Sequence, residues 1–143
     1  MKNTISGILL LFAFASLSCG CGGGGGREDE IVEKENLSKY PEQLESRRMV
    51  FNADNQFLFA RDGSFVGKRA GKDCLGTYSY QGGTLTLHYG FTFPGNTERY
   101  ECTGTLSGYD SATGRGTYSY TETSSGGKAL TPFPTQFTLS KET

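Results

Sequence analysis

The sequence predicts an all-β protein, an antiparallel up-and-down meander of seven or eight short strands that follows a signal peptide and a flexible Gly-rich tether. Three observations predict this organisation. From Met49 onward apolar residues alternate with polar ones, as in strands that bury one face. Gly, Asp and Asn interrupt the alternation at short intervals, as turns do. The apolar run 8–17 has the length of a signal-peptide core and is too short to cross a bilayer.

The composition excludes several classes of protein. The length of 143 residues fits one domain, which excludes a multidomain enzyme and a multi-span membrane protein. Fourteen basic and fifteen acidic residues give a net charge of −1, so no basic surface for nucleic acid is expected. We divide the chain into a signal peptide (1–18), a tether (19–48) and a β domain (49–143).

The end of the signal peptide carries a cysteine pattern. Small residues lead into Cys19, and the pattern resembles a bacterial lipoprotein signal, in which the cysteine at the cleavage point is lipidated. Cys21 is the competing acceptor, and cleavage after Ala15 to give a soluble secreted protein is the alternative. The resemblance implies a lipid anchor, with palmitate, in the bacterial cell envelope, and we expect the outer membrane.

The tether has two parts. Gly20 and Gly22–Gly26 cannot hold a helix or strand, because each glycine loses too much backbone entropy on ordering, and they predict a flexible spacer. The segment 27–35 is charged and mostly acidic, and Pro41 could start a short helix at Glu42, so residues 27–48 are expected to be a solvated tether with a transient helix. An acidic signal for surface export is the sharper alternative.

The β domain contains eight candidate strands, the first being the least regular. In order they are 48–52, 56–61, 64–68, 74–80, 84–93, 98–106, 115–121 and 135–139. Asp62-Gly63 is a strong two-residue hairpin signal, and Gln81-Gly82-Gly83 turns the chain again. Pro94-Gly95-Asn96 ends the fifth strand, and the segment 108–114 and a longer polar loop separate the last three.

The alternation assigns one side of each strand to a common core. The inward set is Phe57, Phe59, Phe65, Tyr78, Tyr80, Leu85, Leu87, Tyr89, Phe91, Phe93, Tyr100, Leu106, Tyr118, Tyr120, Phe137 and Leu139. Aromatic side chains of this size allow a small domain to build a sufficient core. Closure of the sheet into a barrel would also remove exposed strand edges.

Short motifs in these strands resemble a known family. The run Phe57–Gly63, the sequence Cys-Leu-Gly-Thr-Tyr from Cys74, and Gly-Thr-Leu-Thr-Leu from Gly83 are similar to the small bacterial lipocalin-like domains of the calycin group. The stretch from Gly104 to Tyr118 is similar to their later hairpin, so the resemblance covers residues 50–141 at most. It implies a lipocalin-like barrel that binds small apolar or amphipathic molecules.

Five tyrosines, Tyr78, Tyr80, Tyr89, Tyr118 and Tyr120, are candidate ligand-binding residues because the alternation points them inward. A buried tyrosine hydroxyl needs a hydrogen-bond partner. Such partners are either backbone carbonyls and water at the rim, or an amphipathic ligand in a cavity that the tyrosines line.

Cys74 and Cys102 are the only cysteines of the β domain. Export implies an oxidising compartment, and both cysteines share a strand face with inward residues, so we expect a disulfide between them. His88, the only histidine, alternates with inward neighbours and should face solvent without a second metal ligand. We therefore expect no metal, no cofactor and no catalytic activity.

Three functional hypotheses remain. The leading one is a lipid-anchored envelope lipoprotein whose barrel binds a small amphipathic or hydrophobic ligand. The second is a surface protein-interaction module, an adhesin or enzyme inhibitor, which acts through the segments 108–114 and 121–134. The third is a structural envelope protein without a ligand.

Overall fold

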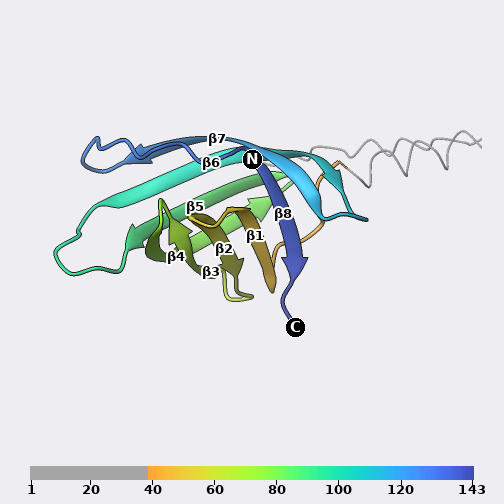
Figure 1. The fold of residues 1–143 in the computed structure, drawn as a ribbon, viewed down its shortest axis with the longest axis horizontal. Coiled ribbons are helices and arrows are strands. Elements are labelled where there is room, and N and C mark those ends of the chain that lie inside the picture. Colours follow the sequence, from red (N-terminus) through yellow and green to blue (C-terminus); the bar gives the residue numbers. More distant parts are fainter. Residues whose placement is uncertain (1–38) are drawn as a thin grey trace, which may run out of the picture.

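The structure is a computed structural model that describes residues 39–143. The predicted signal peptide, the lipidation site at Cys19 with its competitor Cys21, and the glycine spacer lie outside the described residues. Figure 1 shows the described part of the chain, coloured along its length.

Eight antiparallel strands form a closed barrel in which each strand pairs with the next along the chain. They are β1 (Arg47–Asn52), β2 (Asn55–Phe59), β3 (Ser64–Arg69), β4 (Lys72–Gln81), β5 (Thr84–Phe91), β6 (Arg99–Asp110), β7 (Arg115–Ser124) and β8 (Gln136–Lys141). The last strand pairs with the first, and the two lie side by side in Figure 1. Residues 39–143 contain no helix. The all-β class and the meander order are therefore confirmed.

The predicted turns lie where the glycines allow them. Gly63 has a φ of 82° and Gly83 the same value, a left-handed conformation that side chains other than glycine rarely adopt. The strand ends differ from the prediction mainly around β5 and β6. β5 ends at Phe91, and β6 continues to Asp110. The carboxylate of Asp110 then accepts hydrogen bonds from the Ala112 amide and the Thr113 hydroxyl, which stabilise the turn to β7.

Glycines on the inward side of three strands let neighbouring strands of the barrel wall approach closely. A Cβ atom on Gly67, Gly76 or Gly104 would lie 2.1, 1.9 and 2.3 Å from a carbonyl oxygen of the neighbouring strand. Only glycine permits so close an approach of two backbones. The repeated sequence Gly-Thr-Tyr-Ser-Tyr, which starts at Gly76 and at Gly116, therefore has its glycine at an inward position of the wall.

The core fills the barrel interior with the predicted inward residues, and all but four of them are buried. Tyr78, Tyr80 and Tyr120 are half-buried and pack against the core. Phe93 is an error of the prediction, because its side chain is 41 % exposed. The strand ends at Phe91, so the alternation no longer determines which way Phe93 points.

The barrel begins earlier than the predicted boundary at Met49. Leu44 is only 1 % exposed, and the Ser46 amide donates to the Phe59 carbonyl at 2.8 Å. The Tyr80 hydroxyl donates to the carbonyl of Pro41. Residues 39–46 therefore belong to the barrel unit, and 39–143 hold a closed sheet with its own core, as an independently folding domain needs.

Candidate ligand site at the barrel seam

The five candidate tyrosines occupy different parts of the interior. Near one end of the barrel the hydroxyls of Tyr78 and Tyr80 donate to the carbonyls of Ala60 and Pro41. Deep inside, the hydroxyl of Tyr118 donates to the Leu85 carbonyl at 2.8 Å. These three hydroxyls thus have backbone partners, one of the two arrangements expected for buried tyrosines.

The other two tyrosines contact a polar cluster and a loop. The Tyr89 hydroxyl donates to the carboxylate of Glu122. The Tyr120 hydroxyl donates to the Phe133 carbonyl at 3.1 Å and accepts from the Phe133 amide at 3.0 Å. These two tyrosines therefore lie where the interior is lined by a charged side chain and by a loop, and neither hydroxyl binds strand backbone.

A buried ion pair forms the centre of this region. Arg69, at the end of β3, is 1 % exposed and donates to Glu122 of β7 from Nε at 3.0 Å and from Nη2 at 2.6 Å. Its Nη1 donates to the Asn55 side chain at 3.2 Å and to the Thr131 carbonyl at 2.9 Å. Bidentate arginine–carboxylate pairs of this kind are strong and directional. Among the described residues, every buried side-chain nitrogen and oxygen atom has a hydrogen-bond partner.

The ionisation of these groups follows from their surroundings. Burial disfavours the Arg69 cation, but the hydrogen bond and the negative charge of Glu122 outweigh burial and raise the pKa of Arg69. Burial, followed by the hydrogen bond to Glu122, raises the pKa of Tyr89 well above its ordinary range. The site therefore holds the Arg69 cation and the neutral Tyr89 phenol at ordinary pH, and both donate to the Glu122 side chain.

The barrel wall has a seam between β7 and β8. Only Arg115, Gly116 and Thr117 of β7 pair with β8, although β7 continues to Ser124. The segment 125–135, which we call the plug, folds back along the part of β7 that does not pair with β8. The Tyr118 amide donates to the carbonyl of Thr135 at 2.7 Å, so the plug contacts the strand directly.

Phe133 is the residue that the plug inserts into the interior. It is 4 % exposed, and its ring stacks on Tyr120 with centroids 4.2 Å apart and planes 6° apart. Phe51 packs edge-on at 4.5 Å, and the guanidinium of Arg69 lies 4.8 Å from the Phe133 ring centre. A slot with aromatic walls and a cation at its side thus holds a side chain that comes from no strand.

Sequence reasoning missed this cluster, although a signal for it was present. Arg69 follows Phe65 and Gly67 on the inward side of β3, and Glu122 follows Tyr120 on the inward side of β7. Opposite charges at inward positions of two strands indicate a buried pair. The alternation does not indicate Phe133, because it lies outside the strands.

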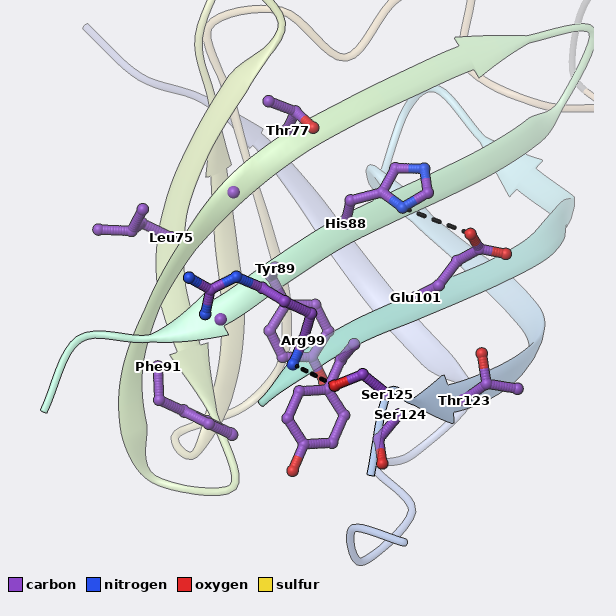
Figure 2. A pocket seen from close by; sticks show the side chains of 13 residues that line it. Leu75, Thr77, His88, Tyr89, Phe91, Arg99, Glu101, Thr123, Ser124 and Ser125 are labelled. Atoms are coloured by element: carbon purple, nitrogen blue, oxygen red, sulfur yellow. Dashed lines mark hydrogen bonds and ion pairs between the residues drawn. The ribbon is translucent and has the colours of Figure 1, made fainter. Parts of the chain in front are cut away.

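A surface hollow of about 630 Å³ lies on the outer face of β4 to β7 (Figure 2). Across it the Nδ1 atom of His88 lies 3.4 Å from the Glu101 carboxylate, and both side chains are more than half exposed. His88 therefore faces solvent, as predicted. Arg99 reaches across the same hollow, and its backbone amide donates to the Ser125 hydroxyl at 3.1 Å.

The expected disulfide between Cys74 and Cys102 is not formed, and both cysteines are free and buried. β5 lies between their strands, where Cys74 pairs with Phe91 and Cys102 with Leu87. Two strand spacings, about 10 Å, and four residues along β5, about 13 Å, therefore separate them. Both side chains do face inward, but a disulfide needs Cα atoms within about 7 Å. Burial raises the pKa of each thiol to about 12.

Residues 39–143 contain no group of three potential metal-ligating side chains and no helix long and apolar enough to cross a membrane. Comparison with protein-family models, curated proteins and solved structures finds no match to the chain. The class of protein that the fold and the site define is thus an eight-stranded antiparallel barrel with a buried ion pair and an internal plug.

Proposed function

We propose that this protein is a non-catalytic, lipid-anchored lipoprotein of the bacterial cell envelope whose lipocalin-like barrel binds a small amphipathic or hydrophobic ligand at the seam. The observation that carries this proposal is the insertion of Phe133 between Tyr120, Phe51 and Arg69. An eight-stranded barrel has room for its side chains or for one small ligand. At the seam, that room is taken by a loop residue.

The contacts that hold the plug are ones that a ligand can replace. The Arg69 Nη1 atom and the Tyr120 hydroxyl bind backbone groups of Thr131 and Phe133, not strand atoms. A flat apolar body would take the place of the Phe133 ring, and a carbonyl or carboxylate would accept from Arg69. The ligand class is thus an amphipathic molecule with an aromatic body and an anionic or carbonyl group.

Several observations bear on the second hypothesis, a protein-interaction module that acts through loops. β6 ends at Asp110 and β7 begins at Arg115, so the first of the two segments is a tight turn. In the second segment, Phe133 inserts its side chain into the seam, while most other residues of the plug are exposed. The tight turn argues against a loop-based site in the first segment, and the buried Phe133 side chain supports a ligand site at the seam.

A dye titration tests the ligand site. The probe is 8-anilinonaphthalene-1-sulfonate, which combines an aromatic body with an anion, and the protein is the chain of residues 39–143. Phe133→Ala empties the slot and should tighten dye binding about tenfold or more, because the dye then buries its rings there. Phe93→Ala removes an exposed ring and is the matched control.

A second variant separates the slot from nonspecific dye binding. Tyr120→Phe in the Phe133→Ala background removes the hydroxyl that faces the slot and should weaken the gained binding. Cooperative unfolding of each variant shows that the barrel stays folded. If folded Phe133→Ala binds the dye no better than Phe93→Ala, the seam is not a ligand site.

Metabolic labelling tests the anchor. In bacterial cells that express the full chain, a labelled fatty acid should attach to the parent protein and to Cys21→Ala, but not to Cys19→Ala. Label that persists in Cys19→Ala and disappears in Cys21→Ala would move the acceptor to Cys21. Absence of label from the parent would contradict the lipid anchor.

A further inference from the structure

The plug is held in the seam by side chains of the barrel and not as a further length of strand. Continued beyond its last pair, the β7–β8 register places Phe133 opposite Tyr120. The amide and carbonyl of Phe133 nevertheless bind the hydroxyl of Tyr120 and not its backbone. The Thr131 carbonyl accepts from the buried Arg69, and a cleft of about 370 Å³ is lined by both β7 and the plug. The plug therefore lies against the barrel as a bound peptide does, with its backbone recognised by side chains.

These contacts select a short pattern of residues. The ring of Phe133 stacks on Tyr120 in the slot, and the carbonyl that Arg69 binds lies two residues earlier in the chain. Leu130, three residues before Phe133, is partly buried and packs against the core. The other residues of the segment 128–135 are exposed. The barrel thus recognises an apolar side chain, a backbone carbonyl and an aromatic side chain within four successive residues.

Two prolines favour the shape in which this pattern is presented. Thr131 and Phe133 each precede a proline, and a residue before proline prefers an extended backbone. The carbonyl and the ring that the barrel recognises therefore belong to a chain that loses little conformational freedom on binding. An extended peptide without sheet hydrogen bonds, of the polyproline type, has the same advantage.

We propose that the ligand of the seam is a short extended peptide with an apolar residue three positions before an aromatic one, and that the plug occupies this peptide site from within the chain. The proposal rests on the ligand site proposed above and names the class of its ligand, since such a peptide supplies both the aromatic body and the carbonyl group.

The peptide belongs to another molecule and not to the plug of a second copy. Both ends of the plug are tied to β7 of its own barrel. The Gly127 amide donates to the Ser124 carbonyl at 3.2 Å, and the Tyr118 amide donates to the Thr135 carbonyl at 2.7 Å. Exchange of plugs between two copies would have to break both hydrogen bonds, whereas a separate peptide has only to displace the segment between them.

Fluorescence anisotropy tests the proposal with a labelled peptide, Lys-Ala-Leu-Thr-Pro-Phe-Pro-Thr, which copies residues 128–135. The protein is the chain of residues 39–143 with Phe133→Ala, in which the plug no longer fills the slot. This peptide should bind at least about tenfold more tightly than one with alanine in place of the phenylalanine, because only the former buries a ring. The parent barrel should bind the peptide at least about tenfold more weakly than the variant, because its own Phe133 competes at high effective concentration.

Further variants show where the peptide binds. Tyr120→Phe in the Phe133→Ala background removes the hydroxyl that recognises the backbone and should weaken peptide binding about fivefold. Phe93→Ala, which removes an exposed ring, should bind the peptide as weakly as the parent. If Phe133→Ala does not unfold cooperatively, Phe133→Leu, which keeps an apolar side chain in the plug, is the second background.

The dye 8-anilinonaphthalene-1-sulfonate separates this proposal from the general one. The peptide should displace the dye from Phe133→Ala. Dye binding together with equal affinity for the phenylalanine and alanine peptides would overturn the peptide proposal and leave the ligand site standing. Equal peptide binding by parent and variant would also overturn it, because the peptide would then bind elsewhere. A dimer of the parent chain in sedimentation, without peptide binding, would assign the slot to a second copy. Failure of both dye and peptide to bind would remove the seam site as well.

Discussion

Arg69 and Glu122 lie 53 residues apart in the chain and meet inside the barrel through two parallel hydrogen bonds, at 3.0 and 2.6 Å. The side chains are 1 % and 11 % exposed, so water scarcely reaches either charge. A buried pair does not by itself indicate high stability, because desolvation of both ions is costly. Loss of only one partner is a different matter, since the remaining charge stays buried without compensation.

Glu122→Gln should therefore destabilise the barrel by about 3–5 kcal/mol. The variant keeps the shape of the side chain but leaves the Arg69 cation without its counter-charge, and it also changes the acceptor for Tyr89. Glu101→Gln is the control, because Glu101 belongs to an exposed pair with His88 and should cost less than about 1 kcal/mol. Urea unfolding measures the free energy of unfolding of both variants. Equal urea midpoints for the two variants would contradict a structural role of the buried pair.

Cys74 and Cys102 should remain thiols under oxidising conditions. In the chain of residues 39–143, a thiol reagent should react only after unfolding, because both side chains are buried and their pKa values are raised to about 12. Reductant should leave the thermal unfolding temperature unchanged. A lower unfolding temperature in reductant, or failure to react in denaturant, would indicate the disulfide after all.

Alkaline pH should destabilise the barrel through its tyrosines. Burial raises the pKa of Tyr80 from 10.0 to about 12, so the folded state holds the phenolic proton more tightly than the unfolded state. This contribution is fully present below pH 10 and is lost as the pH rises through about 12. Absorbance of ionised tyrosine should show Tyr89 and Tyr118 ionising only with unfolding. Full ionisation of all tyrosines in a folded barrel would be inconsistent with these shifts.

Gly104→Ala tests the close approach of strands β6 and β7. The new methyl carbon would lie 2.3 Å from the Ser119 carbonyl oxygen, so the backbones must separate. We expect a loss of about 1–3 kcal/mol in the free energy of unfolding. Thr105→Ala, at the exposed next position, should change it by less than about 0.5 kcal/mol. A Gly104→Ala variant as stable as the parent would show that the wall accommodates a side chain at this position.

The strand pattern was predictable because it depends on local alternation and turn residues. The hairpin at Asp62-Gly63 and the inward set from Phe57 to Leu139 follow from neighbours in the sequence. Phe93 shows the limit of this reasoning: its direction depends on where β5 ends, which is a property of the whole sheet.

The disulfide prediction was wrong because strand parity gives the side of the sheet but not the distance along it. Cys74 and Cys102 both face inward, as expected, yet the register of β5 places their partners four residues apart. Register in a barrel is set by all its pairings together. The seam could not be predicted either, because Phe133 enters the core from a segment that has no strand periodicity.

The short pairing of β7 with β8 also has a consequence for self-association. Beyond Thr117, β7 has no strand of residues 39–143 on its β8 side, and a bare strand edge can recruit another chain by continuing the sheet. The plug covers this edge with the sequence Pro132-Phe133-Pro134. Proline has no amide hydrogen to extend a ladder, so the plug shields the edge without offering a new one. Its removal should therefore promote aggregation.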